Sequence, residues 1–149
     1  MPGPAQDPAE IIELSGEECL RLLAAHSFGR LAVGIGDRVP VIRPLNYAFD
    51  ERAKVVILRI GEGSTLSAIA SHAKAAFEID GIDEPSRTGW SVIVTGVAEM
   101  VNAAAEIERL DRSAPVGWAE GGRTHWVSLR AGRVTGRRIT SAAERAANR

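Results

Sequence analysis

The residues best suited to hold a ligand lie in the stretch VVILRIGEGSTLSAI, residues 55–69. Successive backbone N–H groups in a turn, continued by the free N–H groups at a helix start, form a concave site that favours an anion. The two glycines permit such a backbone, Ser64 and Thr65 add hydroxyl donors, and Arg59 carries a guanidinium that binds phosphate bidentately. The stretch therefore predicts a phosphate site, although it lacks the lysine of a P-loop and the spacing of a dinucleotide fingerprint. A plain strand-to-helix turn with Ser64 as its N-cap is the alternative.

Other side chains offer little chemistry of their own. His26, His72 and His125 lie far apart in the sequence without a carboxylate at ligand spacing, so no metal site is expected. Serines such as Ser67 and Ser91 lack the G-x-S-x-G context of a hydrolase nucleophile. No catalytic residue is assigned from these side chains.

The segments before the turn are typical of antiparallel strands. Two runs, residues 30–33 and 39–49, are separated by GIGD, whose glycines and aspartate suit a hairpin turn. Pro44 in the second run cannot donate to a ladder, so its backbone lies at an edge, at a bulge or against a ligand. The branched run VVILRI is a third strand, and STLSAIASHA after the turn reads as a short helix.

Elements outside this region complete a small β fold. Ser15 and Glu18 form a capping box before an amphipathic helix, and Asn102 is the expected cap of a second helix. Residues 81–89 read as a polar loop, and Gly96 inside a long strand indicates a bulge or a close approach. Six or seven antiparallel strands with two or three short helices predict a mainly β protein, a β-barrel with helices at its openings. A sandwich is the alternative.

Composition limits the class of protein further. The 149 residues predict one domain over 1–149, with flexible tails at 1–10 and 141–149. Because 18 Lys and Arg residues nearly balance 19 Asp and Glu residues, binding to nucleic acid or an anionic membrane is not expected. The first residues do not resemble a signal peptide, no apolar run reaches membrane-spanning length, and Cys19, expected to be a packed core thiol, is the one cysteine. These features favour a soluble protein of the cytoplasm.

Six segments of the chain, taken in order, resemble a known superfamily. GRLAV, VPVIRPLNYAFD, VVILRIGEGSTLSAI, AAFEID, GWSVIVTGVAEMV and HWVSLRAGRVTGRRI resemble, in that order, the flavin-binding split β-barrel superfamily related to pyridoxamine 5'-phosphate oxidase. The resemblance covers residues 14–139. It implies the flavin-reductase-like split barrel as the fold, a homodimer as the assembly, and FMN in each of two clefts at the interface.

The resemblance also implies which residues bind the cofactor. The strand matching residues 42–46, with Arg43, Pro44 and Asn46, lies along the flavin ring in such proteins. Further positions implied at the cofactor are Arg59, Ile60, Ser64 and Thr65 at the phosphate, and Trp90 and Ser91 nearby.

Two departures from the family pattern affect the expected ligand. Thr65 stands where the family's GxKL pattern commonly has lysine. Three consequences are open: FMN is bound weakly, Arg59 or Arg43 holds the phosphate instead, or a deazaflavin is bound. The chain also shows no equivalent of the C-terminal segment with which true pyridoxamine 5'-phosphate oxidases hold the vitamin phosphate. Oxidation of pyridoxamine phosphate is accordingly not the first expectation.

The resemblance implies two kinds of function. The first is an FMN-dependent oxidoreductase that passes hydride from a reduced nicotinamide, or another donor, to a small conjugated or nitroaromatic acceptor. Flavin chemistry needs no side-chain nucleophile, and nitroimidazole reductases are similar in the Arg-Pro-x-Asn-Tyr region. The second is a non-catalytic protein that stores or senses a flavin, a deazaflavin or haem. Trp90, Trp118 and Trp126 would either wall a flat cofactor or pack in the core or interface.

Overall fold

The strands form one antiparallel sheet, most of which curls into a barrel. The computed structural model describes residues 8–34, 36–70, 73–114 and 123–149. The strands are β1 (Glu10–Glu13), β2 (Phe28–Val33), β3 (Val41–Asp50), β4 (Val55–Gly61), β5 (Ala73–Asp83), β6 (Thr88–Met100), β7 (Thr124–Arg130) and β8 (Arg133–Thr140). Their order is β1-β8-β6-β5-β2-β3-β4-β7, and an additional pairing of β6 with β7 closes the ring. The predicted barrel is therefore confirmed, and a sandwich is wrong.

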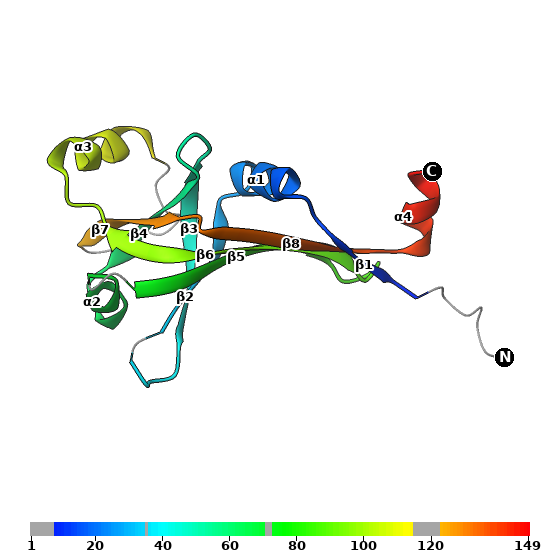
Figure 1. Cartoon of the computed structure of the whole chain (residues 1–149), viewed down its shortest axis with the longest axis horizontal. Coiled ribbons are helices and arrows are strands. Elements are labelled where there is room, and N and C mark those ends of the chain that lie inside the picture. Colours follow the sequence, from blue (N-terminus) through cyan, green and yellow to red (C-terminus); the bar gives the residue numbers. More distant parts are fainter. Residues whose placement is uncertain (1–7, 35, 71–72, 115–122) are drawn as a thin grey trace.

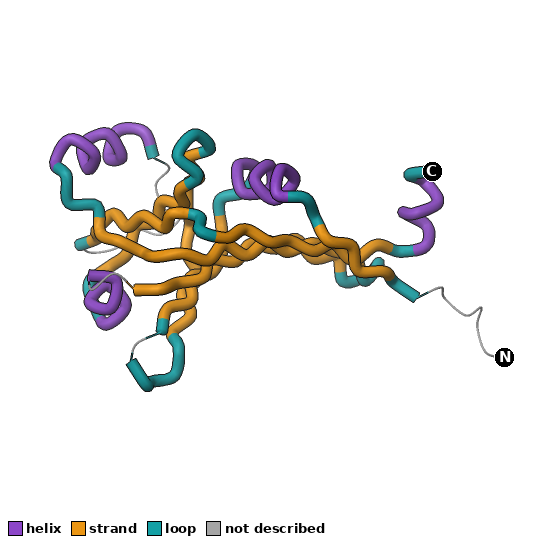
Figure 2. Tube along the Cα trace, in the orientation of Figure 1, coloured by secondary structure: helices purple, strands orange, loops and turns teal. Residues whose placement is uncertain are grey.

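Four helices accompany the described sheet. They are α1 (Gly16–Ala25), α2 (Ser64–Ala70), α3 (Ala104–Ser113) and α4 (Ala142–Ala147). Helix α1 begins with the predicted capping box of Ser15 and Glu18. Figure 1 shows α3 beyond β4 and β7, while α1 lies over the part of the sheet that contains β8. Figure 2 shows long strands leaving the barrel towards the end where both termini lie.

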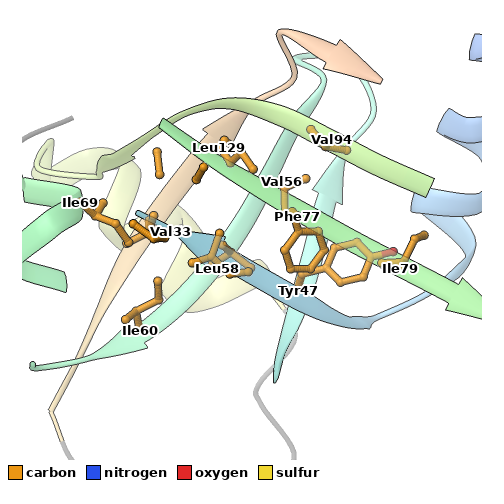
Figure 3. Close-up of a cluster of buried hydrophobic side chains, with 14 of the residues drawn as sticks. Val33, Tyr47, Val56, Leu58, Ile60, Ile69, Phe77, Ile79, Val94 and Leu129 are labelled. Carbon is orange, nitrogen blue, oxygen red and sulfur yellow. The ribbon is translucent and has the colours of Figure 1, made fainter. Parts of the chain in front are cut away.

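Alternating strand residues build the core. Phe77, Leu31 and Val94 are among its fully buried side chains, and Figure 3 shows Phe77 beside Tyr47. The Tyr47 hydroxyl donates to the carbonyl of Leu23 at 2.7 Å, so the core ties α1 to β3. Burying each large apolar side chain contributes about 1.5–3 kcal/mol, which makes this cluster the main source of stability.

The helices close the barrel with apolar side chains. Cys19 of α1 is fully buried in the main core, as expected for a packed thiol, and burial raises its pKa. Leu66 and Ile69 of α2 join the same core. Helix α3 contributes Leu110 to a second, smaller cluster on the outside of the barrel with Val55, Ile57 and Trp126.

Gly96 lies where β6 changes its partner. The register pairs Thr95 with Arg133 of β8, and Ala98 with Leu129 of β7. A Cβ atom at Gly96 would lie 2.1 Å from the carbonyl oxygen of Arg130. The close approach predicted for this glycine is confirmed, and it occurs where the barrel closes.

Several sequence-based expectations need correction. The predicted loop 81–89 is wrong at both ends, because Gly81–Asp83 continues β5 and Thr88 and Gly89 belong to β6. The ladder continues there because β8 pairs on the other side of β6. Asn102 is not the N-cap of α3; Ala103 occupies that position and makes no side-chain cap bond.

The chain ends also contain regular structure. Strand β1 begins within the predicted N-terminal tail, and α4 lies within the predicted tail 141–149, where Ser141 and Glu144 form a second capping box. None of the helices in the described segments is long and apolar enough to cross a membrane. His72 and Trp118 lie outside the described residues.

Candidate functional site

The predicted residues of β3 lie on different faces of the strand. Neighbouring side chains of a strand point to opposite faces. Leu45 and Tyr47 pack in the core, so Pro44 and Asn46 lie on the outer surface of the barrel. Arg43 has the orientation of Leu45, yet its side chain is exposed. The strand therefore brings Pro44 and Asn46 together and separates Arg43 from them.

The same alternation separates Arg59 from Ile60 on β4. Ile60 is 4% exposed and points into the core, as Figure 3 shows, so only its backbone is available to a ligand. Arg59 lies on the outer surface, directly opposite Trp126 of β7. Its guanidinium lies 4.8 Å from the centre of the Trp126 ring and 3.9 Å from Oδ1 of Asp111 on α3.

The turn after β4 has the backbone that its glycines predict. Gly63 has a φ of +149°, which side-chain-bearing residues rarely adopt, and its carbonyl accepts the first bonds of α2 from the backbone N–H and hydroxyl of Ser67 at 3.0 and 3.1 Å. Ser64 is the first residue of α2, and its side chain is outside the described part of the structure.

Thr65 is the residue of this turn that best fits a ligand. It is 4% exposed, and its Oγ1 atom has no hydrogen-bond partner among the described residues. A buried hydroxyl without a partner costs about 1–3 kcal/mol, so such groups are rare unless something else satisfies them. A phosphate oxygen would supply the missing acceptor. The residues present thus fit a phosphate-bearing cofactor at this end of β4.

Two side chains of β7 and the residue before it, which the sequence did not reveal as neighbours, lie beside the turn. Glu62 Oε1 is 3.6 Å from His125 Nε2 and 3.8 Å from Arg123 Nε. The pairing of β4 with β7, which places Gly61 opposite Thr124, brings them there. Only the cross-strand register reveals this neighbourhood, because more than 60 residues separate the two segments in the sequence.

Trp90 and Ser91 of β6 point to opposite faces. The Trp90 ring lies 4.8 Å from the ring of His26, next to α1. Ser91 is paired with Asp80 of β5 and faces the outer surface. Ser91 therefore shares a surface with Pro44, Asn46 and Arg59, whereas the Trp90 side chain does not.

The outer surface also carries a charged group next to the predicted ring-binding strand. Arg30 is paired with Pro44 of β3, and its guanidinium lies 3.4 Å from Glu78 and 3.3 Å from Asp80. Burial, and then the neighbouring Asp80, raise the pKa of Glu78 to about 7, while Arg30 opposes the shift. A carboxyl that titrates near neutral pH is thus available on this surface, a feature that sequence reasoning missed.

The described residues contain no group of three His, Cys, Asp or Glu side chains that could hold a metal ion. The groups that the structure offers at this end of β4 are the guanidinium of Arg59 and the buried hydroxyl of Thr65.

A mainly β barrel closed by short helices, with this turn after its third barrel strand, matches the flavin-binding split barrels. The sequence profile of one family, described as pyridoxamine 5'-phosphate oxidase, matches residues 15–138. The chain belongs to that family.

The chain is also similar to individual proteins and solved structures. The FAD binding protein from Mycobacterium smegmatis is 32% identical, with a TM-score of 0.70 over 87% of this chain and 100% of that chain. An FAD-binding protein from Mesorhizobium loti is 20% identical, with a TM-score of 0.71 over 90% of this chain and 100% of that one, which supports the fold alone. The uncharacterized protein Rv0080 of Mycobacterium tuberculosis is 37% identical over 95 residues, 61% of this chain and 61% of that protein.

Proposed function

We propose that this protein binds a flavin nucleotide and acts as an oxidoreductase. A bound flavin would supply the redox chemistry, hydride transfer between a reduced nicotinamide, or another donor, and a small conjugated or nitroaromatic acceptor. The protein's own residues bind the phosphate, orient the ring and restrict access of water. No side-chain nucleophile is required.

The observation that carries the proposal is the buried hydroxyl of Thr65 in the turn between β4 and α2. It lacks a partner among the described residues, and it occupies the position at which the family commonly has a phosphate-binding lysine. Arg59, on the strand β4 that leads into this turn, supplies a guanidinium, and its side chain is 42% exposed. Together they replace one ammonium contact by a hydroxyl and a guanidinium, both of which donate hydrogen bonds to phosphate.

The shared chemical group of the ligand is the riboflavin 5'-phosphate unit. It occurs in FMN, which the family resemblance implies, and in FAD, which the M. smegmatis relative binds according to its description. A deazaflavin remains the alternative ring. Titrations with FMN, FAD, riboflavin and a deazaflavin distinguish these ligands.

We further propose that the functional unit is a homodimer. Large apolar side chains are exposed on the outer surface of the barrel: Phe28 (38%), Ile42 (63%), Ile93 (42%) and Val97 (39%). A hollow of about 560 Å³, lined largely by small or apolar residues such as Ala32 and Ala76, lies on the same surface. Such a patch is typical of a surface that another subunit covers.

The test uses the purified protein. We expect a yellow preparation, or one that becomes yellow with added flavin, whose absorbance is bleached by NADH or NADPH without oxygen and restored by a nitroaromatic compound. Bound flavin that no donor reduces would favour the second candidate, a storage or sensing protein for a flavin, deazaflavin or haem. A protein that binds no flavin would contradict both flavin functions.

A further inference from the structure

Arg59 is held in place by two residues from distant parts of the chain. Its guanidinium lies over the ring of Trp126, with 4.8 Å between the guanidinium carbon and the ring centre. One of its terminal nitrogens, Nη2, lies 3.9 Å from Oδ1 of Asp111 on α3. This last distance exceeds that of a hydrogen bond, so the N–H groups of Arg59 keep their capacity to donate to a ligand oxygen.

Trp126 is itself fixed. It is 7% exposed and packs in the small cluster with Leu110 of α3. Its indole Nε1 donates a hydrogen bond of 2.7 Å to Oδ1 of Asp111. A ring that is buried on one side and bonded at its edge has little freedom to turn, and it therefore offers a rigid face to the cation.

An arginine held in this way has lost much of its rotational freedom before a ligand arrives. A free arginine side chain has many rotamers, and part of that freedom is lost when it binds phosphate. Ordering the side chain in advance lowers that cost. The gain applies only to a ligand group that Arg59 contacts, so it would not affect the flavin ring.

We infer that Trp126 is a positioning residue for phosphate recognition, with Asp111 of α3 fixing its indole so that Arg59 stands ready for the flavin phosphate. The inference rests on the proposed function. It gives α3, which lies on the outside of the barrel, a role in ligand selection, and it gives Trp126 a function other than walling the flavin ring.

The test compares the affinities for FMN and riboflavin, which differ only in the phosphate. In wild type we expect FMN to bind at least about tenfold more tightly, and Arg59→Ala to remove most of that preference, since a charge-assisted bond contributes one to two decades. Trp126→Met removes the aromatic face and should reduce the preference about threefold to tenfold. Trp126→Phe keeps a ring face and should stay within about twofold of wild type.

Leu23→Ala is the matched control. Leu23 of α1 is fully buried in the main core, a cluster that includes neither Trp126 nor Leu110. It should lower the melting temperature and leave the ratio of the two affinities unchanged. If Trp126→Met does not fold, Trp126→Leu provides the same comparison with a smaller side chain.

Three outcomes separate this inference from the proposed function. If wild type binds neither ligand, the proposed function fails. If Arg59→Ala narrows the preference but the Met and Leu variants of Trp126 do not, the inference is overturned while the flavin function stands. If Trp126→Met in an Arg59→Ala background still changes the ratio, Trp126 acts independently of Arg59, and the inference is again overturned.

Discussion

At the scale of single residues, Thr65 most clearly distinguishes this chain from the pattern of its family. Its position was identified from the sequence as the place where a lysine is common. The burial of Thr65 and the lack of a partner for its hydroxyl could not be identified from the sequence, because both depend on how α2 packs against the end of the barrel. The Thr65 hydroxyl is therefore a candidate for the phosphate contact that a lysine would make at this position.

The substitution Thr65→Val tests whether the Thr65 hydroxyl contacts the phosphate. Valine has nearly the same shape and lacks the hydroxyl, so the unliganded protein should keep or slightly raise its melting temperature, because a buried unsatisfied group has been removed. FMN affinity should fall about threefold to thirtyfold, and riboflavin affinity should change little. Titration calorimetry and thermal melts measure these quantities.

Thr65→Ser is the control for this substitution, because it retains a hydroxyl at the same place. It should bind FMN more tightly than Thr65→Val does. Equal FMN affinity in wild type and Thr65→Val would show that the hydroxyl does not contact the phosphate.

Glu78 makes stability depend on pH. Its pKa is raised from 4.5 to about 7 in the folded protein, so the folded state binds this proton more tightly than the unfolded state does. The resulting stabilisation is fully present below about pH 4.5 and is lost as the pH rises towards about 7. We expect Glu78→Gln, which cannot ionise, to lack this decline in melting temperature between those two pH values.

Glu99→Gln, an exposed glutamate of β6, is the matched control and should follow the wild-type profile. Parallel melting curves of wild type and Glu78→Gln across the whole range would contradict the raised pKa of Glu78.

At the scale of elements, local signals in the sequence predicted most strands and the first capped helix. Branched residues identified β4, and the capping box identified the start of α1. The polar segment 81–89 was predicted as a loop, but its residues at both ends extend the hairpin of β5 and β6. Gly81, for example, leaves room for the Trp90 ring, since a Cβ atom would lie 2.6 Å from its Nε1.

A substitution at Gly96 tests how the barrel closes between β6 and β7. Because its Cβ would lie 2.1 Å from a backbone carbonyl, Gly96→Ala should force β6 away from the end of β7. We expect a loss of about 3 kcal/mol in the free energy of unfolding, the upper part of the range for overpacked sites. Urea denaturation followed by circular dichroism measures it.

Gly16→Ala provides the comparison, because Gly16 opens α1 and no heavy atom lies within 4 Å of the added Cβ. Its stability should be unchanged or slightly higher. Equal effects of the two substitutions would mean that β6 is not constrained at Gly96.

At the scale of the whole molecule, the sequence predicted the barrel but not the distribution of residues over its two surfaces. Faces follow from register, and a single sequence does not specify register across strands as distant as β4 and β7. For this reason the nine residues predicted to bind the cofactor do not all lie on one face of the sheet. The side chains of Pro44, Asn46, Arg59 and Ser91 share the outer surface.

The exposed apolar surface makes a prediction about assembly. Aspartate at Ile42 or Ile93 should convert a wild-type dimer into monomers, at a cost of about 2 kcal/mol or more in association free energy for an interface hot spot. Flavin affinity should fall with the dimer, because the family resemblance implies clefts at the interface. Light scattering coupled to gel filtration measures the mass.

Val39→Asp is the control for assembly, because Val39 is 84% exposed in the connection between β2 and β3. It should leave the mass unchanged. A wild-type protein that is monomeric at every concentration would contradict the proposed homodimer.

The central claim is that the turn between β4 and α2 binds the phosphate of a flavin nucleotide. Its most direct test is the ratio of the dissociation constants for riboflavin and FMN, measured by fluorescence titration of the wild-type protein. We expect a ratio of at least about ten, from one charge-assisted bond to the phosphate. Equal affinities for the two ligands, or no binding of either, would contradict it.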